Sequence, residues 1–396
     1  MIVCVLIPRF ELAVAAGGRD VLAAGPVALA PEPGRDPVIG EVSAPAEAYG
    51  VRAGLRLGEA LARCPTLRLV APDPAGVADA WDGVLRSLEG IGAAVESERA
   101  GAAWFSAGGL KTLHGGSLDG VLAAARAALR APARLGAAPS RFAAFAAAGR
   151  ARARRPEVTP TAAAARAAYL APLPVALLRA RPETAALPDA LERFGIRTLG
   201  ELARLPRASL ADRFGPSGPL ARDLAQGKDS PLVAQEPAER LEERLELPES
   251  ASGSQLQHGL GLLIDRLLAR RERRGRALRA VVLSARLVEG GTWRARVTFR
   301  EPLADPRRMR LVLGVRLGEL PSPTDVLTLR AEGFGPPAGD QRSLLAEPAA
   351  IRRARLREAV RQARSVAGPD AALRIIPVDP DSRVPERRLA LTPWDP

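Results

Sequence analysis

The stretch LRAVVLSARLVEGGTWRARVTFR, residues 278–300, predicts an antiparallel β-hairpin. Residues 278–288 are rich in aliphatic and β-branched side chains, and Glu289-Gly290-Gly291 supplies the glycines that a tight turn needs. Polar and apolar residues then alternate through 292–300, which predicts a strand with one packed face and one outer face. The outer face would carry Arg294, Arg296, Thr298 and Arg300.

Residues on both sides of the hairpin extend it to a β-α-β-β-α-β unit. A strand is expected at 241–247, and the helix after it has apolar residues at i, i+4, i+7, i+8, i+11 and i+12, a single stripe from Leu256 to Leu268. A second helix and a strand at 326–332 complete the unit. The Gly/Pro-rich residues 335–339 predict a linker, followed by a tail with a basic helix at 349–366 and a strand at 373–378.

The N-terminal half predicts an α+β fold with antiparallel strands and helices on one face. Strands are expected at 1–8, 26–30, 67–70, 93–96 and 102–107, and helices at 56–64, 75–92, 117–129 and 141–153. Residues 157–228 are helical in pattern but are interrupted by prolines, which predicts short helices; the interrupting residues include Pro172, Pro174, Pro182, Pro188, Pro206 and Pro216.

Composition indicates a globular protein with a polyanionic partner. The 396 residues suffice for several domains, and 47% of them are hydrophobic. The net charge is +13, and all but two of the 57 basic residues are arginine, which favours nucleic acid but is also typical of a GC-rich genome. Two cysteines and two histidines predict neither a disulfide framework nor a zinc site, and no cofactor is expected. No membrane span or signal peptide is apparent, so we expect a cytoplasmic, nucleoid-associated protein.

Three motifs resemble those of the Y-family (UmuC/DinB-like) DNA polymerases. They are AYGVRAGL at 48–55, APSRFA at 138–143 and LERFGIRTLGEL at 191–202. The resemblance covers nearly the whole chain and implies a polymerase-like right hand. The implied domains are a palm (1–16 and 71–155), fingers (17–70), a helical thumb (156–236), a DNA-binding little finger (237–334) and a C-terminal extension with linker and clamp-binding motif (335–396).

The carboxylates that hold two Mg²⁺ ions in active relatives are missing. VLIPRF at 5–10 stands where the family has V-D-M-D-A-F, so Leu6 replaces the first aspartate. RAGAAWFS at 99–106 places Gly101 and Ala102 where an Asp-Glu pair is expected. Since Mg²⁺ needs oxygen ligands, the resemblance implies no metal site and no polymerase chemistry.

Positions that contact the triphosphate in active relatives also differ. Ala44 and Glu47 replace an aromatic residue and an arginine, and Phe145 replaces a lysine. A glutamate repels a triphosphate where an arginine would donate two hydrogen bonds. Glu11, Glu96 and Glu98 are the alternative ligands of a displaced metal site, which would keep the chain an active lesion-bypass polymerase. Glu98 precedes Gly101 by three residues, about 10 Å along a strand.

Within the family, the chain most resembles the catalytically inactive ImuB-type subgroup, through Val95-Glu96, Trp104-Phe105 and the extension at 378–388. The resemblance implies a non-catalytic adaptor of a damage-induced mutasome. Its implied partners are primer-template DNA bound without sequence preference, the sliding clamp, a RecA-like ImuA-type accessory protein and an error-prone C-family DNA polymerase. A protein-interaction hub whose basic faces never touch DNA is a third possibility.

Two sets of residues are expected to make these contacts. QRSLL at 341–345 resembles a clamp-binding pentamer in which a glutamine and two terminal apolar residues enter a pocket; the residues are Gln341, Ser343, Leu344 and Leu345. The expected DNA-binding residues are the arginines on the outer face of 292–300, called the arginine row, together with the arginines in the turn before residue 278. Their guanidinium groups should bind phosphates. These residues are Arg270, Arg271, Arg273, Arg274, Arg276, Arg294, Arg296 and Arg300.

Overall fold

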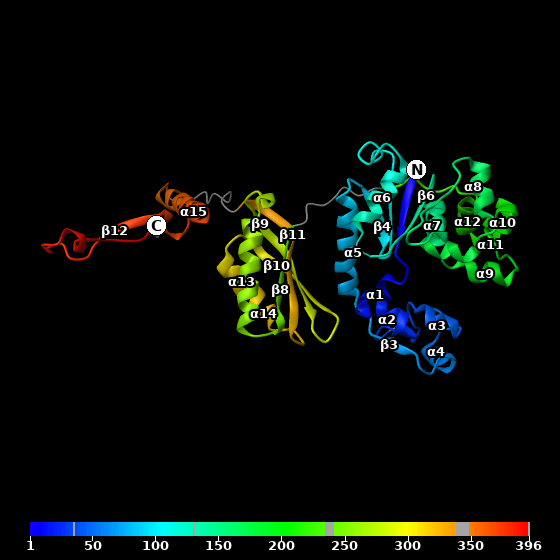
Figure 1. The fold of residues 1–396 in the computed structure, drawn as a ribbon, viewed down its shortest axis with the longest axis horizontal. Coiled ribbons are helices and arrows are strands. Elements are labelled where there is room, and N and C mark those ends of the chain that lie inside the picture. Colours follow the sequence, from blue (N-terminus) through cyan, green and yellow to red (C-terminus); the bar gives the residue numbers. More distant parts are fainter. Residues whose placement is uncertain (35, 130, 234–240, 338–347, 395–396) are drawn as a thin grey trace.

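The structure, a computed structural model, describes residues 1–34, 36–129, 131–233, 241–337 and 348–394. A five-stranded central sheet organises the N-terminal half (Figure 1). Its first strand is antiparallel to both of its neighbours. In sheet order the strands are β4 (Val95–Arg99), β5 (Ala102–Ser106), β1 (Ile2–Leu6), β6 (Arg134–Ala138) and β7 (Glu157–Val158).

Helices cover both faces of the central sheet, so the expectation of helices on one face is wrong. Val3 and Val5 pack with α5 (Pro74–Glu89) and α6 (Leu118–Ala128). Cys4, on the other face, packs with α7 (Arg141–Arg150). The reason is that β1 is apolar at every position, as in strands buried on both sides.

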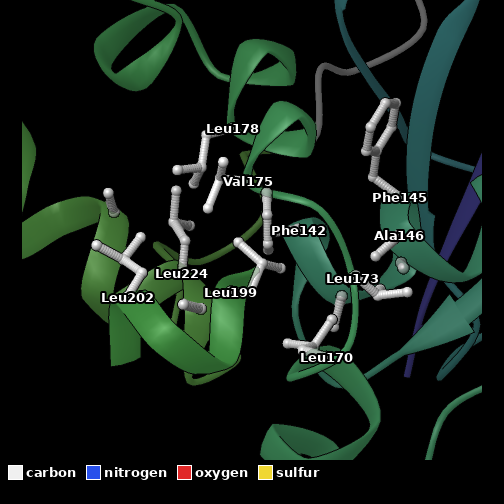
Figure 2. Packing of buried hydrophobic residues seen from close by; sticks show 14 of the residues in the cluster. Phe142, Phe145, Ala146, Leu170, Leu173, Val175, Leu178, Leu199, Leu202 and Leu224 are labelled. Atoms are coloured by element: carbon white, nitrogen blue, oxygen red, sulfur yellow. The ribbon is translucent and has the colours of Figure 1, made fainter. Parts of the chain in front are cut away.

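Short helices form a layer beyond α7, as the prolines predict. Figure 2 shows Leu173, Leu199 and Leu202 of this layer packed towards Phe142 of α7. The layer and the second face of the sheet therefore share one hydrophobic core. Its elements are α8 (Ala163–Leu170), two 3-10 turns (Val175–Ala180 and Pro182–Thr184), α9 (Leu187–Arg193), α10 (Leu199–Arg204), α11 (Arg207–Phe214) and α12 (Ser217–Ala225).

A small lobe extends from one end of the central sheet (Figure 1). Two parallel strands support it, and Ile39, Val51 and Cys64 are buried in its core. This core is separate from the two cores that flank the central sheet. The elements of this region are α1 (Phe10–Ala15), α2 (Arg19–Ala24), β2 (Val27–Leu29), α3 (Ala44–Ala48), α4 (Leu57–Arg63) and β3 (Arg68–Val70).

The predicted β-α-β-β-α-β unit is confirmed as a second sheet with two helices on one face. Its strand order is β10-β9-β11-β8, with every neighbouring pair antiparallel. Gly290 and Gly291 both have positive φ in the predicted turn, at 97° and 83°. The elements are β8 (Glu242–Ala251), α13 (Ser254–Ala269), β9 (Arg276–Leu287), β10 (Thr292–Leu303), α14 (Pro306–Leu317) and β11 (Thr324–Pro337).

The last strand of this sheet continues into the expected linker. Gly335 and Pro337 belong to β11, and Pro337 is paired with Arg276 of β9. The Phe334 ring lies under the Arg276 guanidinium, 4.1 Å from the ring centroid. The prediction that 335–337 form a linker is therefore wrong, because this pairing extends the strand beyond the residues that favour turns.

The C-terminal part contains the predicted helix and strand and one more strand. α15 (Pro348–Ala367) is followed by β12 (Leu373–Pro377), which pairs with β13 (Leu389–Pro393). Across the part of the chain that the structure describes, no helix has the length and hydrophobicity that crossing a bilayer would need.

Candidate functional site

The structure brings the three expected metal-ligand positions together. Leu6 of β1 is the direct partner of Ala102 of β5, and the Ile7 N–H donates to the Gly101 carbonyl at 2.8 Å. Residues directly opposite in an antiparallel pair project to the same face of a sheet. The side chains of Leu6 and Ala102 therefore meet, as the motif alignment predicts, and both are hydrocarbon.

These residues do not fit a pair of magnesium ions. Mg²⁺ binds through carboxylates, other oxygens and water, and neither leucine nor alanine offers such a ligand. Gly101 has φ of +86°, and a Cβ there would lie 3.2 Å from the Ile7 carbonyl oxygen and 3.3 Å from Phe10 Cβ. The backbone at residue 101 thus also disfavours an aspartate.

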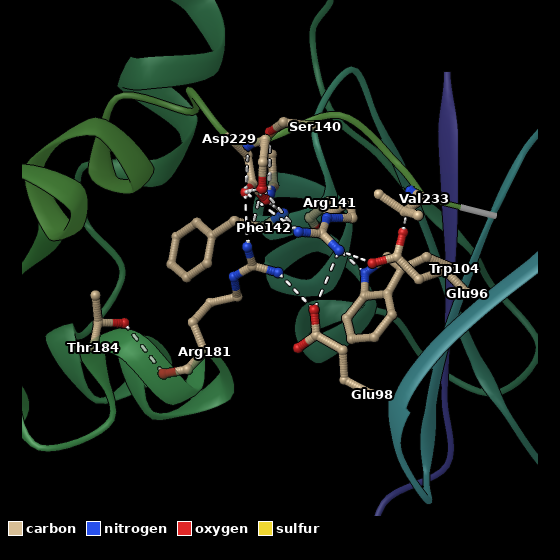
Figure 3. A network of polar contacts seen from close by, with 12 residues as sticks. Glu96, Glu98, Trp104, Ser140, Arg141, Phe142, Arg181, Thr184, Asp229 and Val233 are labelled. Carbon is tan, nitrogen blue, oxygen red and sulfur yellow. Dashed lines mark hydrogen bonds and ion pairs between the residues drawn. The ribbon is translucent and has the colours of Figure 1, made fainter. Parts of the chain in front are cut away.

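The nearest carboxylates on β4 are engaged by arginines. Figure 3 shows Glu96 ion-paired with Arg141 of α7, while its Oε2 accepts the Val233 N–H at 2.6 Å. Glu98 accepts from Nη1 of Arg141 at 3.2 Å and from Nη1 of Arg181 at 3.0 Å. Both carboxylates that could have served a displaced metal site are therefore neutralised by guanidinium groups. The third, Glu11, is exposed in the first turn of α1.

A buried ion cluster joins the sheet to the helical layer (Figure 3). Asp229 Oδ1 lies 3.2 Å from Arg181 Nη2, and Asp229 Oδ2 accepts the Phe142 N–H at 2.9 Å. The Asp229 side chain is fully buried, and Arg141 and Arg181 are each 5% exposed. Burial, followed by the charge of Arg181, lowers the pKa of the Arg141 guanidinium. Burial of this kind makes each member of the cluster dependent on its partners.

The positions expected to contact a triphosphate have other roles. Glu47 forms an ion pair with Arg9 at 2.7 Å, and Arg9 Nε donates to the Val42 carbonyl at 2.8 Å, which ties α3 to the start of α1. Phe145 is buried, with its ring centroid 6.4 Å from that of Trp104. Ala44 begins α3 and lines the cleft described next.

An arginine-lined cleft of about 640 Å³ lies between the central sheet and the small lobe. Its basic side chains come from four separate segments. Burial, followed by the charges of Arg134 and Arg9, lowers the pKa of the Arg19 guanidinium. Several guanidinium groups close together favour the binding of an anionic ligand. Sequence reasoning missed this cleft because nothing in the spacing of its arginines predicts that they meet. They are Arg9, Arg19, Arg134 and Arg152.

The second sheet displays the predicted alternation of β10. Val297 and Phe299 are buried in its core, and the arginines lie on the face away from α13 and α14. Arg294 forms an ion pair with Asp79 of α5, so the row does not consist of unpaired arginines. The two other arginines of the row are Arg296, ion-paired with Glu332 but 63% exposed, and Arg300, an exposed residue.

Some arginines of the expected basic turn form ion pairs or hydrogen bonds within the second sheet and its helices. Arg270 is paired with Glu243, and Arg273 Nε donates to the Leu268 carbonyl at 2.9 Å. Arg274 adopts a left-handed backbone with φ of 51°. Arg271 is exposed at this turn. Arg279, just after the turn, donates to the Arg300 carbonyl at 2.7 Å, so the turn and the end of the β10 row meet at one edge of the sheet.

The expected clamp-binding residues Gln341, Ser343, Leu344 and Leu345 lie outside the described residues. The structure therefore leaves this motif as a sequence prediction.

Residues 7–149 match the impB/mucB/samB family. This part of the chain is therefore similar to that family. The match bears out the UmuC/DinB-like resemblance read from the motifs, and it supports a role connected with DNA damage and translesion synthesis. The α+β, multidomain class is confirmed as well.

Individual relatives include both an enzyme and a protein of the expected subgroup. The DNA polymerase IV of Dehalococcoides mccartyi strain CBDB1 is 25% identical over 350 residues, which is 87% of this chain and 88% of that protein. Protein ImuB of Caulobacter vibrioides strain NA1000 / CB15N is 30% identical over 239 residues, 58% of this chain and 50% of ImuB. The chain thus matches half the length of that ImuB. Among solved structures, an insertion ternary complex of Dbh DNA polymerase covers 84% of this chain and 99% of its own, with a TM-score of 0.48 and 15% identity.

Proposed function

We propose that this protein is a non-catalytic, DNA- and clamp-binding adaptor that supports translesion synthesis by recruiting an error-prone polymerase. The observation that carries the proposal is the pairing of Leu6 with Ala102 where a metal-binding site would need carboxylates. A palm without these ligands cannot gather the two cations that phosphoryl transfer to a primer requires. The engaged state of Glu96 and Glu98 supports the same conclusion.

The proposal assigns the structural units to polymerase-like domains. The central sheet with α5, α6 and α7 would be the palm, the small lobe the fingers, the helical layer the thumb and the second sheet the little finger. Separate hydrophobic cores in the small lobe and in the second sheet support the assignment of the fingers and the little finger, whereas the helical layer shares a core with the central sheet.

DNA is proposed to bind without sequence preference, through guanidinium contacts to phosphates. The exposed side chains Arg271, Arg296 and Arg300 supply one surface for these contacts. The cleft around Arg19 and Arg134 supplies a second. Arg294 would bind a phosphate only after its ion pair with Asp79 is broken.

The protein partners are proposed from the similarity to ImuB over half of that protein's length. They are the sliding clamp, a RecA-like ImuA-type protein and an error-prone C-family polymerase. A clamp pull-down tests the first: capture should fall with Gln341→Ala and with Leu344→Ala, and undiminished capture by both variants would remove the motif.

Primer extension tests the absence of catalysis. The purified chain is incubated with primer-template DNA, nucleotides and either Mg²⁺ or Mn²⁺, with an active DNA polymerase IV as the positive control. We expect binding of the DNA, measured by fluorescence anisotropy, without template-directed incorporation. Incorporation by the pure protein would overturn the adaptor proposal.

The second candidate is an active lesion-bypass polymerase with a displaced metal site. The match to a DNA polymerase IV over 87% of this chain favours it. If incorporation is seen, Glu98→Gln tests Glu98 as a ligand, because Glu98 is the carboxylate nearest to Gly101 along the chain. Loss of incorporation in this variant would support a displaced site that includes Glu98, whereas incorporation that persists would exclude Glu98 as a ligand.

A further inference from the structure

Helix α5 of the central unit lies against the open face of the second sheet. Figure 1 shows α5 on the side of its own unit that faces this sheet. Its N-cap residue Asp73 accepts from the Thr292 hydroxyl at 3.0 Å, and Asp79 is ion-paired with Arg294. One turn further, Asp82 is paired with Arg330 of β11 at 2.5 Å. Three carboxylates on one helix thus contact one face of the sheet.

The contacted face is the one expected to bind DNA. Arg294 and Arg296 lie on it in β10. Val282 of β9 is paired with Arg296 of β10 on one side and with Arg330 of β11 on the other, so these two arginines lie in one row across the sheet. Helices α13 and α14 cover the opposite face. Two of these three arginines are therefore bound to aspartates of another unit, and their side chains are only 26% (Arg294) and 17% (Arg330) exposed.

The contact between the two units is polar and incompletely filled. A further ion pair joins Arg86 of α5 to Glu242 of β8 at 2.9 Å. A space of about 510 Å³ remains between α5 and the sheet, lined largely by charged and small residues. Ion pairs beside such an open space are accessible to water and salt, so each contributes little free energy. A contact of this kind can be separated without unfolding either unit.

We infer that α5 is a built-in competitor of DNA, whose aspartates occupy the sheet face until phosphates displace them. A phosphate and a carboxylate make the same charge-assisted hydrogen bonds to a guanidinium, so both cannot hold Arg294 or Arg330 at once. The closed arrangement weakens DNA binding, because the apparent affinity is the affinity of the open form multiplied by the fraction of molecules that are open. This inference rests on the proposed DNA-binding function and adds its regulation.

The first test removes the competing charges in the full chain. Asp79→Asn with Asp82→Asn keeps the side-chain shape but loses both ion pairs. If nine molecules in ten are closed, we expect about tenfold tighter binding to primer-template DNA at low salt. The double variant should also show a larger radius of gyration in X-ray scattering without DNA. The matched control is Glu89→Gln with Asp119→Asn, which removes the same charge from exposed or partly exposed sites on α5 and α6, outside the contacts that the structure describes between the units.

The control separates release of the sheet from a general gain of positive charge. Equal tightening in both double variants, or unchanged affinity and scattering in the Asp79/Asp82 variant, would overturn the inference.

The second test locks the contact. Asp73→Cys with Thr292→Cys places two thiols where the native side chains meet at 3.0 Å. The native Cys4 and Cys64 are buried and do not interfere. We expect mild oxidation to form the cross-link and to lower DNA affinity, and reduction to restore it, while Thr292→Cys alone responds to neither treatment.

The outcomes distinguish this inference from the proposed function. A cross-link that forms but leaves DNA affinity unchanged overturns the competition, and failure to cross-link overturns the closed contact itself. If no form of the protein binds DNA, the proposed DNA-binding function fails, while scattering and cross-linking still decide whether α5 closes the sheet.

Discussion

Single residues show where sequence reasoning worked and where it could not. The meeting of Leu6 and Ala102 follows from the resemblance, because the motifs align both positions with carboxylates that hold the same metal ions in active relatives. The buried cluster of Arg141, Arg181 and Asp229 was not predicted. Its members come from three distant segments, and no local spacing indicates which arginine of this arginine-rich chain will be buried.

Loss of Arg181 should be severe. Arg181→Met leaves the fully buried Asp229 and the partly buried Glu98 without one of their guanidinium partners. We expect the free energy of unfolding to fall by about 3–5 kcal/mol, since an uncompensated buried charge is costly. Urea denaturation measures it. The control is Arg179→Met, two residues away, whose pair with Asp189 is exposed and should contribute less than about 1 kcal/mol. Equal effects for the two variants would contradict the role assigned to burial.

An aspartate at residue 101 should not be tolerated well. Gly101→Asp forces a residue with a Cβ to φ of +86° and brings this Cβ to 3.2 Å from a carbonyl oxygen. We expect a loss of about 1–2 kcal/mol in thermal or urea unfolding. Gly109→Asp is the control, because Gly109 has no neighbour within 4 Å of a built Cβ. Equal stability of both variants would show that the backbone at residue 101 accepts a side chain.

At the scale of elements, the alternation of polar and apolar residues and the apolar stripes at helical spacing located most strands and helices. The alternation in β10 and the apolar stripe of α13 were both confirmed. Errors came from pairing that overrides local preference: β4 runs to Arg99 rather than ending at Glu96, and β11 continues through Pro337. Strand β6 was missed because its sequence, RLGAA, has little β-branched character.

Helix α10 begins with a capping box that makes it sensitive to acid. The N–H groups of Arg197 and Thr198 donate to Glu201 and lower the pKa of its carboxyl. A lowered pKa in the folded state gives a stabilisation that is present above the unfolded pKa and is lost as the pH falls through the folded value.

Glu201→Gln should therefore reduce stability at neutral pH, and its unfolding curve should converge with that of the wild type as the pH falls below 4 or so. Circular dichroism in urea between neutral and acid pH measures this. Glu192→Gln, on α9, is the control for loss of a glutamate charge in the same layer. A constant gap between Glu201→Gln and the wild type at all pH values would contradict the assignment.

At the scale of the whole molecule, the order of units was predictable, but the contact between them was not. The resemblance implies an order of domains, and the small lobe, the central sheet and the second sheet each contain a separate core. The docking of α5 on the second sheet depends on Asp79 and Arg294, which are 215 residues apart and carry no shared motif. Surface ion pairs of this kind leave no periodic signal in a sequence.

The exposed arginines of the second sheet should set the salt dependence of DNA binding. Arg296→Ala with Arg300→Ala removes two guanidinium groups and should flatten the slope of log affinity against log salt by up to about 1.8. Arg296→Lys with Arg300→Lys keeps the charge and should keep the slope. An alanine variant with the wild-type slope would show that DNA does not contact this edge of the sheet.

The two thiols have a practical consequence. Cys4 lies inside the central sheet and Cys64 inside the small lobe, and burial raises the pKa of the Cys4 thiol far above its ordinary value. A thiol held in this protonated, shielded state resists peroxide and alkylating agents. Cys4 and Cys64 are therefore protected while the parts that bury them stay folded, and their separate alkylation rates would measure the opening of the central sheet and of the small lobe.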